Sequence, residues 1–324
     1  MTYRLVAREK CPACLSKARQ QLARLPLDSS VLRPLLKRYR GAPTNIKGNY
    51  HVVECGGCGT IYQAEVGDAE MLSEVYDTWL NTLPDAAWTA HAEWLATYPR
   101  QSRDGHEIMT VAAMMRTPLA GLKTLDYGMG QGLWARISRE LGCKSYGFDL
   151  SERCMRVARA HGVETIGFDD LANGEFDFVN TEQVIEHVTD LDGVMGRLVA
   201  ALRPEGILKI SVPAQNRVRC ALSQLTIFRT PDPSDLDPIF PLEHVNAFSG
   251  PGLETLGKRF GLSRVAPTRR SRLAFLRDTQ GWSIRFPKNT VKELVRPFMS
   301  YEAATNLTMW FQRPIHPVAS ARRS

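Results

Sequence analysis

Long hydrophobic runs are missing from this sequence. No apolar stretch in its 324 residues approaches the roughly 20 residues that a membrane-spanning helix requires. The first residues carry charges and cysteines where a secretory signal would have an apolar segment. We therefore expect no membrane span and a cytoplasmic location.

The charge balance shows no extreme of either sign. There are 41 Lys and Arg against 34 Asp and Glu, a formal net charge of +7. Such a surface suits nucleic acid, anionic headgroups or a phosphorylated small substrate, and it is also common on soluble enzymes. The 44% hydrophobic content is ordinary for a globular chain, and the length allows one large domain with a small accessory one.

Cysteine is scarce outside two Cys-x-x-Cys pairs. The paired residues are Cys11, Cys14, Cys55 and Cys58. In a cytosolic protein this spacing is typical of a metal site. Four thiolates form a closed tetrahedral Zn²⁺ site with no open position for catalysis, so we predict a structural zinc ribbon over residues 1–65. A redox-active dithiol is the alternative, and the ribbon's simplest role is to fold a small lobe.

Secondary structure around the cysteine pairs is predicted from periodicity. His51–Glu54 and Thr60–Gln63 alternate like the strands of a hairpin around the second pair. Residues 15–40 contain helix-like stretches. Residues 66–119 carry an apolar stripe with helical spacing, which predicts a helical connector.

A glycine-rich turn follows an apolar strand that contains Asp126. Its glycines alternate along the chain: Gly128, Gly130 and Gly132. Residue 133 is leucine, so the turn is not the G-x-G-x-x-G of dinucleotide-binding folds. Glycine here lets backbone N–H groups approach a ligand. Asp149, which ends the next predicted strand, is placed to accept hydrogen bonds from two ribose hydroxyls. Ser151 is the predicted cap of the helix Glu152–Ala160.

The string D-x-G-x-G-x-G resembles the first cofactor motif of class I S-adenosylmethionine-dependent methyltransferases. The resemblance continues through FDFV, EHV and LRPEGILKISVP and covers roughly residues 120–215. It implies an α/β, Rossmann-like sheet, with Asp126 near the methionine amino group and Asp169, or else Asp170, at the adenine. The full set of cofactor-binding residues that we expect is Asp126, Gly128, Met129, Gly130, Gly132, Asp149, Leu150, Asp169, Asp170 and Glu182.

A second motif extends the resemblance towards the carboxyl end. The segment EHVNAFS at 243–249 is similar to one in methyltransferases of bacterial polysaccharide and natural-product clusters, which often begin with a comparable cysteine ribbon. We expect a methyltransferase domain over 120–324, whose last strand is antiparallel and lies near 307–311. Residues 214–241, rich in arginine and proline, have the length of a substrate lid. Residues 267–300 have no clear counterpart.

Methyl transfer to a hydroxyl needs a base, and histidine is the natural choice. The candidates are His187, after the fourth strand, and His244, with Glu186 as an orienting or alternative base. His187 could instead be a packed residue at a helix start. Ubiquinone-type O-methyltransferases resemble this stretch but have a metal-binding Glu where Gln183 stands here. Glu182 is expected beside it on a helix, facing elsewhere, so we do not expect metal-assisted catalysis.

These features favour transfer of a methyl group to oxygen, or to nitrogen, of a small acceptor such as a glycosyl or nucleotide-linked molecule. Arginines in the lid segment suit an anionic acceptor. Sugar C-methyltransferases with a zinc ribbon have a tyrosine where Val184 stands, which disfavours C-methylation. The alternatives are an RNA methyltransferase that docks through the ribbon and basic surface, and a cofactor-binding scaffold without catalysis. The sequence specifies neither the acceptor nor the oligomeric state.

Overall fold

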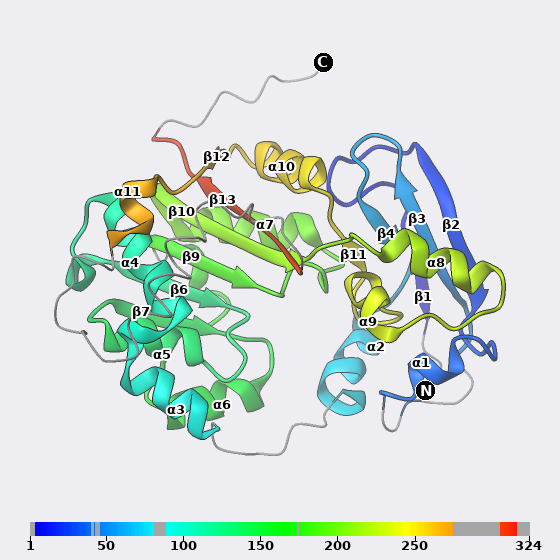
Figure 1. Ribbon diagram of the computed structural model, residues 1–324, viewed down its shortest axis with the longest axis horizontal. Helices are drawn as coiled ribbons and strands as arrows, with labels where there is room; N and C mark the ends of the chain where they lie inside the picture. Colours follow the sequence, from blue (N-terminus) through cyan, green and yellow to red (C-terminus); the bar gives the residue numbers. More distant parts are fainter. Residues whose placement is uncertain are drawn as a thin grey trace.

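The computed structural model describes residues 4–39, 42, 46–80, 89–173, 175–274 and 305–315 of the chain. Within these ranges the strands form one large sheet and two small ones. Figure 1 shows the large sheet with its helices on one side of the molecule and the small sheets in a lobe at the other end. No helix of the described part is long and apolar enough to cross a membrane.

The large sheet has seven strands in the order β12-β13-β10-β9-β6-β7-β8. The strands β8, β7, β6, β9 and β10 run parallel, and β13 lies antiparallel between β10 and β12. Their bounds are β6 (Lys123–Tyr127), β7 (Lys144–Phe148), β8 (Glu164–Thr165), β9 (Phe176–Glu182), β10 (Leu202–Pro213), β12 (Ser263–Val265) and β13 (Asn306–Gln312). The predicted Rossmann-like α/β fold is confirmed, including the antiparallel last strand.

Helices cover both faces of this sheet. Successive residues of β9 point to opposite faces, so Phe178 packs with α4 and α5 while Val179 packs with α7 and α10. Ser151 caps α6 as predicted, since its hydroxyl accepts from the Cys154 N–H. The helices here are α3 (Ala90–Thr97), α4 (Arg103–Met115), α5 (Leu133–Glu140), α6 (Glu152–Ala160), α7 (Leu191–Ala201), α10 (Gly250–Arg259) and α11 (Arg269–Arg272), with single turns η2 (Pro99–Gln101), η3 (Leu119–Gly121) and η4 (Leu171–Asn173).

The lobe is built on a four-stranded sheet in the order β11-β4-β3-β2. A two-stranded sheet and three short helices complete it. The elements are β1 (Leu5–Ala7), β2 (Arg19–Pro26), α1 (Arg33–Leu36), β3 (Asn49–Cys55), β4 (Ile61–Gln63), β5 (Glu65–Gly67), α2 (Ala69–Glu74), the π-helical turn η1 (Val75–Trp79) and β11 (Asn246–Ala247). The predicted hairpin is present as β3 and β4.

The expectation of helix over residues 15–40 is wrong for most of that stretch. Residues 19–26 form β2, which pairs antiparallel with β3. Ala23 and Leu25 are buried while Arg24 between them is exposed, so the relevant period is two and not 3.6. The only helix in the described part of this stretch is the single turn α1.

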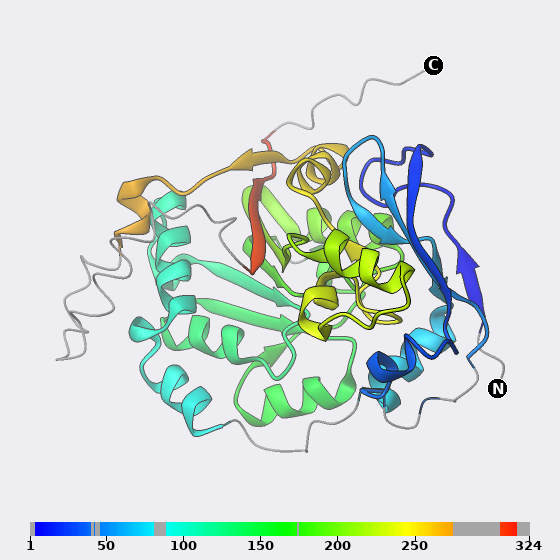
Figure 2. The same ribbon diagram turned by 45° about the vertical axis from the view of Figure 1, so that its right-hand side comes forward.

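The segment predicted as a lid packs against the lobe. It contains α8 (Val218–Thr226), α9 (Pro233–Leu236) and the turn η5 (Asp237–Ile239). Buried α8 residues such as Leu222 share an apolar cluster with Leu25 of β2, and the Tyr50 hydroxyl donates to the Ile239 carbonyl at 2.6 Å. Figure 2 shows this yellow-green segment against the blue strands of the lobe. Residues from the second half of the chain thus form part of the apolar core of the N-terminal lobe.

Candidate functional site

The turn after β6 holds the three predicted glycines in left-handed backbone conformations. Their φ angles are +74° at Gly128, +54° at Gly130 and +83° at Gly132. A Cβ on Gly128 would lie 2.4 Å from the Val184 side chain, and one on Gly132 would lie 2.8 Å from Ala158. Backbone conformation and packing therefore both require glycine at these two positions.

The carboxylate of Asp149 stabilises this turn through hydrogen bonds to the backbone. Its carboxylate accepts from the Gly130 N–H at 2.8 Å and from the Ser151 N–H at 2.9 Å. Burial raises the pKa of Asp149. The neighbouring Leu150 side chain is 84% exposed. Asp169 and Asp170 lie exposed beyond β8, so they and Asp149 follow the carboxyl ends of adjacent parallel strands, where open α/β sheets bind ligands. Their contacts with a cofactor remain predictions.

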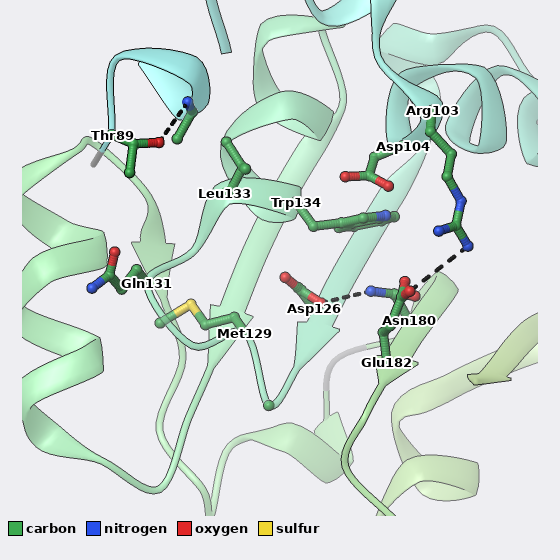
Figure 3. A pocket seen from close by; sticks show the side chains of 12 residues that line it. Thr89, Arg103, Asp104, Asp126, Met129, Gln131, Leu133, Trp134, Asn180 and Glu182 are labelled. Carbon is green, nitrogen blue, oxygen red and sulfur yellow. Dashed lines mark hydrogen bonds and ion pairs between the residues drawn. The ribbon is translucent and has the colours of Figure 1, made fainter. Parts of the chain in front are cut away.

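A cavity of about 450 Å³ opens beside the glycine turn (Figure 3). Its size is in the range of small-molecule sites. The residues that line it are Thr89, Ala92, Arg103, Asp104, Asp126, Gly128, Met129, Gln131, Leu133, Trp134, Asn180 and Glu182. Four of the predicted cofactor residues are in this set, Asp126, Gly128, Met129 and Glu182.

Asp126 is the buried acid of this cavity. Its carboxylate accepts from the Asn180 amide at 2.8 Å, and Figure 3 shows the two side chains facing each other below Trp134. Burial raises the pKa of Asp126 to about 7 and that of Asp104, which also lines the cavity, to about 6. A cation in the cavity would favour the ionised form of both acids. The cavity is therefore suited to a positively charged ligand.

Glu182 also lines the cavity but is not where the sequence placed it. It is the last residue of β9 rather than part of a helix, and the chain leaves the strand only at Gln183, which has a φ of +56°. The wholly buried ammonium of Lys209 on β10 donates to Glu182 at 2.9 Å and to Glu107 of α4 at 2.8 Å. Burial alone would raise the pKa of Glu182, but the charge and hydrogen bond of Lys209 and the charge of Arg103 together outweigh it, so the pKa is lowered.

The catalytic candidates come together in a second cluster. Glu186 and His187 follow β9, and His244 comes from the segment before β11. One ring nitrogen of each histidine and one carboxylate oxygen of Glu186 lie within 4.8 Å of one another. The two imidazole rings meet edge to face, with centroids 4.4 Å apart. Val184, whose side chain packs against Gly128, lies just before Glu186 and His187 in the chain, so this cluster lies close to the glycine turn.

Hydrogen bonds assign the proton positions on both imidazoles. The Tyr76 hydroxyl donates to the Glu243 carbonyl at 3.1 Å, so it accepts from His187 Nδ1, 2.8 Å away. His244 Nδ1 donates to the carbonyl of Asp237. The arrangement that satisfies all of these hydrogen bonds places the hydrogen of each ring on Nδ1 and leaves a lone pair on each Nε2.

The buried carboxyl group of Glu186 lies beside these lone pairs and has no hydrogen-bond donor from another described residue. Its side chain is 0% exposed. Burial raises its pKa to about 8. Burial and the neighbouring His244 hold the pKa of His187 well below its usual range. The cluster thus presents hydrogen-bond acceptors and a carboxyl group that is largely protonated near neutral pH.

Several functional residues were not identified from the sequence. The guanidinium of Arg103 lies 3.7 Å from a carboxylate oxygen of Glu182 at the cavity wall. The ammonium of Lys209 pairs with the other oxygen of the same carboxylate. In the sequence, Arg103 is marked only by the helix cap Ser102 that precedes it, and Lys209 only as a single lysine in an apolar strand. Tyr76, which lies within the predicted helical connector, contacts His187 across 111 residues of chain. Contacts over such separations leave no local pattern.

The four paired cysteines converge in the lobe. Their sulfur atoms all lie within 4.8 Å of one another, with Cys11 to Cys58 at 3.7 Å and Cys14 to Cys55 at 3.4 Å. None of the chain's seven cysteines, all of them described, forms a disulfide. Thiolates on a tetrahedral Zn²⁺ with bonds of about 2.3 Å stand about 3.8 Å apart, so this arrangement fits zinc.

Curated relatives resemble part of the chain. A "Ubiquinone biosynthesis O-methyltransferase" from Thiobacillus denitrificans is 35% identical over 112 residues, which cover 31% of this chain and 48% of that protein. One of the same name from Ralstonia nicotianae is 26% identical over 171 residues, covering 48% of this chain and 65% of that protein. The chain spans about half the length of the first of these relatives.

Solved structures of methyltransferases align with much of the chain at low sequence identity. The magnesium protoporphyrin IX methyltransferase ChlM from Synechocystis PCC 6803, with bound SAH, has a TM-score of 0.43 and 15% identity, covering 75% of this chain and 96% of that one. The plantazolicin methyltransferase BpumL, also with SAH, has a TM-score of 0.47 and 15% identity, covering 76% and 94%.

The match to a family model spans the glycine turn, both histidines and all the residues that line the cavity except Thr89 and Ala92. The model is described as "Methyltransferase domain" and it matches residues 93–266, more than half of the chain. The chain therefore belongs to this methyltransferase family.

Proposed function

We propose that the chain transfers a methyl group from S-adenosylmethionine to a hydroxyl oxygen of a small acceptor beside His187 and His244. One observation carries the proposal: the Nδ1 of each imidazole is in a hydrogen bond, and with the ring hydrogens placed there two Nε2 lone pairs lie next to a buried carboxyl group. Lone pairs of this kind accept a hydroxyl proton. The printed name of the curated relatives, O-methyltransferase, supports oxygen as the acceptor atom.

The roles of the two histidines follow from their surroundings. Because its pKa lies well below the usual range, His187 stays neutral and is suited to accept a hydrogen bond that orients the acceptor. We assign the base to His244, whose Nε2 takes the hydroxyl proton as the new carbon–oxygen bond forms. Glu186 lies close enough for an oxygen of its carboxyl group to accept a hydrogen bond from the resulting imidazolium. When bound, S-adenosylmethionine would supply the methyl group from its positively charged sulfur, and the neutral thioether S-adenosylhomocysteine would be the leaving product.

The cofactor residues are assigned in the same proposal. Asp126 and Asp104 would face the ammonium group of the methionine part, and Arg103 its carboxylate, since these side chains line one cavity. Asp149 would hold the ribose, and Asp169 or Asp170 the adenine. The electrostatics favour this arrangement, because two acids with raised pKa values gain from a cationic ligand.

The lobe completes the proposal. The four cysteines would hold one structural Zn²⁺ within residues 1–65, followed by the connector 66–119 and the methyltransferase domain 120–324. Residues 214–241 would border the acceptor, since the Asp237 carbonyl holds His244. Two arginines of that segment are already paired with carboxylates, Arg217 with Asp235 and Arg219 with Glu54, so they add no support for an anionic acceptor.

A transfer assay tests the proposed function. Phenols, nucleoside-diphosphate sugars and amines would be incubated with the zinc-loaded protein and S-adenosylmethionine carrying a labelled methyl group. We expect a labelled methyl ether. We also expect His244→Ala to lower kcat by about 100-fold or more, without changing the affinity for S-adenosylhomocysteine. Methylation of amines alone, or a fully active His244→Ala, would contradict the proposal.

A further inference from the structure

The end of strand β4 in the lobe holds the segment that carries His244. Gln63, the last residue of β4, is 3% exposed. Its side-chain amide donates to the carbonyl of His244 at 2.9 Å and to that of Phe240 at 3.0 Å, and its backbone N–H donates to the Val245 carbonyl at 3.0 Å. Three hydrogen bonds from one residue therefore fix the backbone on both sides of the proposed base.

The chemistry of these contacts requires an amide. The two side-chain partners are both carbonyl oxygens, which only accept, and an NH₂ group has a hydrogen for each of them. A carboxylate at the same place would face two acceptors and repel both. Methionine would fill similar space but leave the buried carbonyls without donors, which is costly in an interior. The side chain of residue 63 therefore has to donate two hydrogen bonds as well as fill the available space.

The segment held by Gln63 also supports the second histidine. Asn246 donates from its amide to the carbonyls of Ile185 and Val188, at 3.1 and 2.7 Å, on either side of His187. The guanidinium of Arg8 in turn donates to Asn246 Oδ1 at 2.8 Å and to the Val245 carbonyl at 3.3 Å. The lobe therefore reaches both imidazoles through residues 244–246.

We propose that Gln63 is a positioning residue for methyl transfer, which holds His244 Nε2 in line with the acceptor hydroxyl without contacting the acceptor itself. This inference rests on the proposed role of His244. It gives the lobe a part in catalysis: strand β4 follows the second cysteine pair directly, so the fold of the lobe determines the geometry of the base. A residue with a purely structural role would change stability and leave the balance of kinetic constants unaltered.

The test compares Gln63→Met and Gln63→Glu with the control Gln21→Glu, an exposed residue on β2 of the same sheet. Each variant would be assayed with the best hydroxyl acceptor of the panel above. We expect at least a tenfold loss of kcat for both Gln63 variants, while the affinity for S-adenosylhomocysteine in calorimetry stays within twofold. Amide hydrogen exchange should rise in peptides covering 240–247. Gln21→Glu should match the wild type in all three measurements.

A double-mutant cycle separates this inference from the proposed function. If Gln63 acts through His244, adding Gln63→Met to His244→Ala should produce no further loss. An equal additional loss in that background, or unchanged exchange in 240–247, would overturn the positioning role. A fully active His244→Ala would instead refute the proposed base, and the exchange measurement would still test whether Gln63 orders the segment.

Discussion

Lys209→Met should destabilise the fold strongly. The ammonium is 0% exposed and donates to Glu107 and Glu182 at 2.8 and 2.9 Å, and these carboxylates are only 14% and 27% exposed. Methionine keeps most of the side-chain volume but leaves two acids unpaired beside the cavity. Loss of one partner from a buried ion pair costs about 3–5 kcal/mol. Because Glu182 is partly accessible to water, we expect the lower end, about 3 kcal/mol.

Denaturant unfolding, followed by the fluorescence of Trp134 and Trp310 in the adjacent apolar cluster, measures this change. The control is Lys258→Met, which breaks a 2.6 Å pair with Glu254 on a lysine that is 66% exposed. Such a surface pair contributes at most about 1 kcal/mol. The loss in free energy of unfolding caused by Lys209→Met should become smaller at low pH, where the unpaired carboxylates of Glu107 and Glu182 become protonated. A loss below about 1 kcal/mol at neutral pH would refute the buried-cluster reasoning.

Three further results are expected. Because the pKa of Asp126 is raised to about 7, affinity for S-adenosylmethionine should rise between pH 6 and 8, and ligand-free stability should fall from about pH 4 to 7. In calorimetry and melting, Asp126→Asn should show a smaller rise and a smaller fall, because Asp104 and Glu186, whose pKa values are also raised, keep part of the pH dependence, and unchanged trends would contradict the role of Asp126. Cys14→Ser should lose bound zinc by elemental analysis, whereas exposed Cys220→Ser should keep it, and equal zinc content would contradict the site. Gly128→Ala should weaken cofactor binding at least tenfold, since its Cβ would meet Val184, while Gly130→Ala, with open space around it, should show a smaller loss in the same titration.

The sequence was most informative where structure is local. The alternation of Gly128, Gly130 and Gly132, the cap at Ser151 and the apolar strands each depend on a few consecutive residues, and the predicted fold is confirmed. Residues 15–40 were misjudged because β2 is defined by its pairing with β3, a tertiary contact. An amphipathic strand with charged outer residues can resemble a helix until its partner is known.

The site was predictable only where a motif carries it. His187 and His244 stand in Glu-His pairs, which made them candidates, but their proton positions depend on Tyr76 and Asp237, far away in sequence or in another turn. The buried Lys209 cluster joins α4, β9 and β10, and no single window of sequence contains it. Long-range polar contacts of this kind require coordinates.

Calorimetric titration with S-adenosylmethionine and S-adenosylhomocysteine tests the central claim most directly. The zinc-loaded wild type would be compared with Asp149→Ala and with Glu164→Ala, an exposed control on β8. We predict micromolar binding of both ligands to the wild type and to Glu164→Ala, and its loss in Asp149→Ala. Absence of binding by well-folded wild-type protein would contradict the account of the cavity and of the glycine turn as a cofactor site.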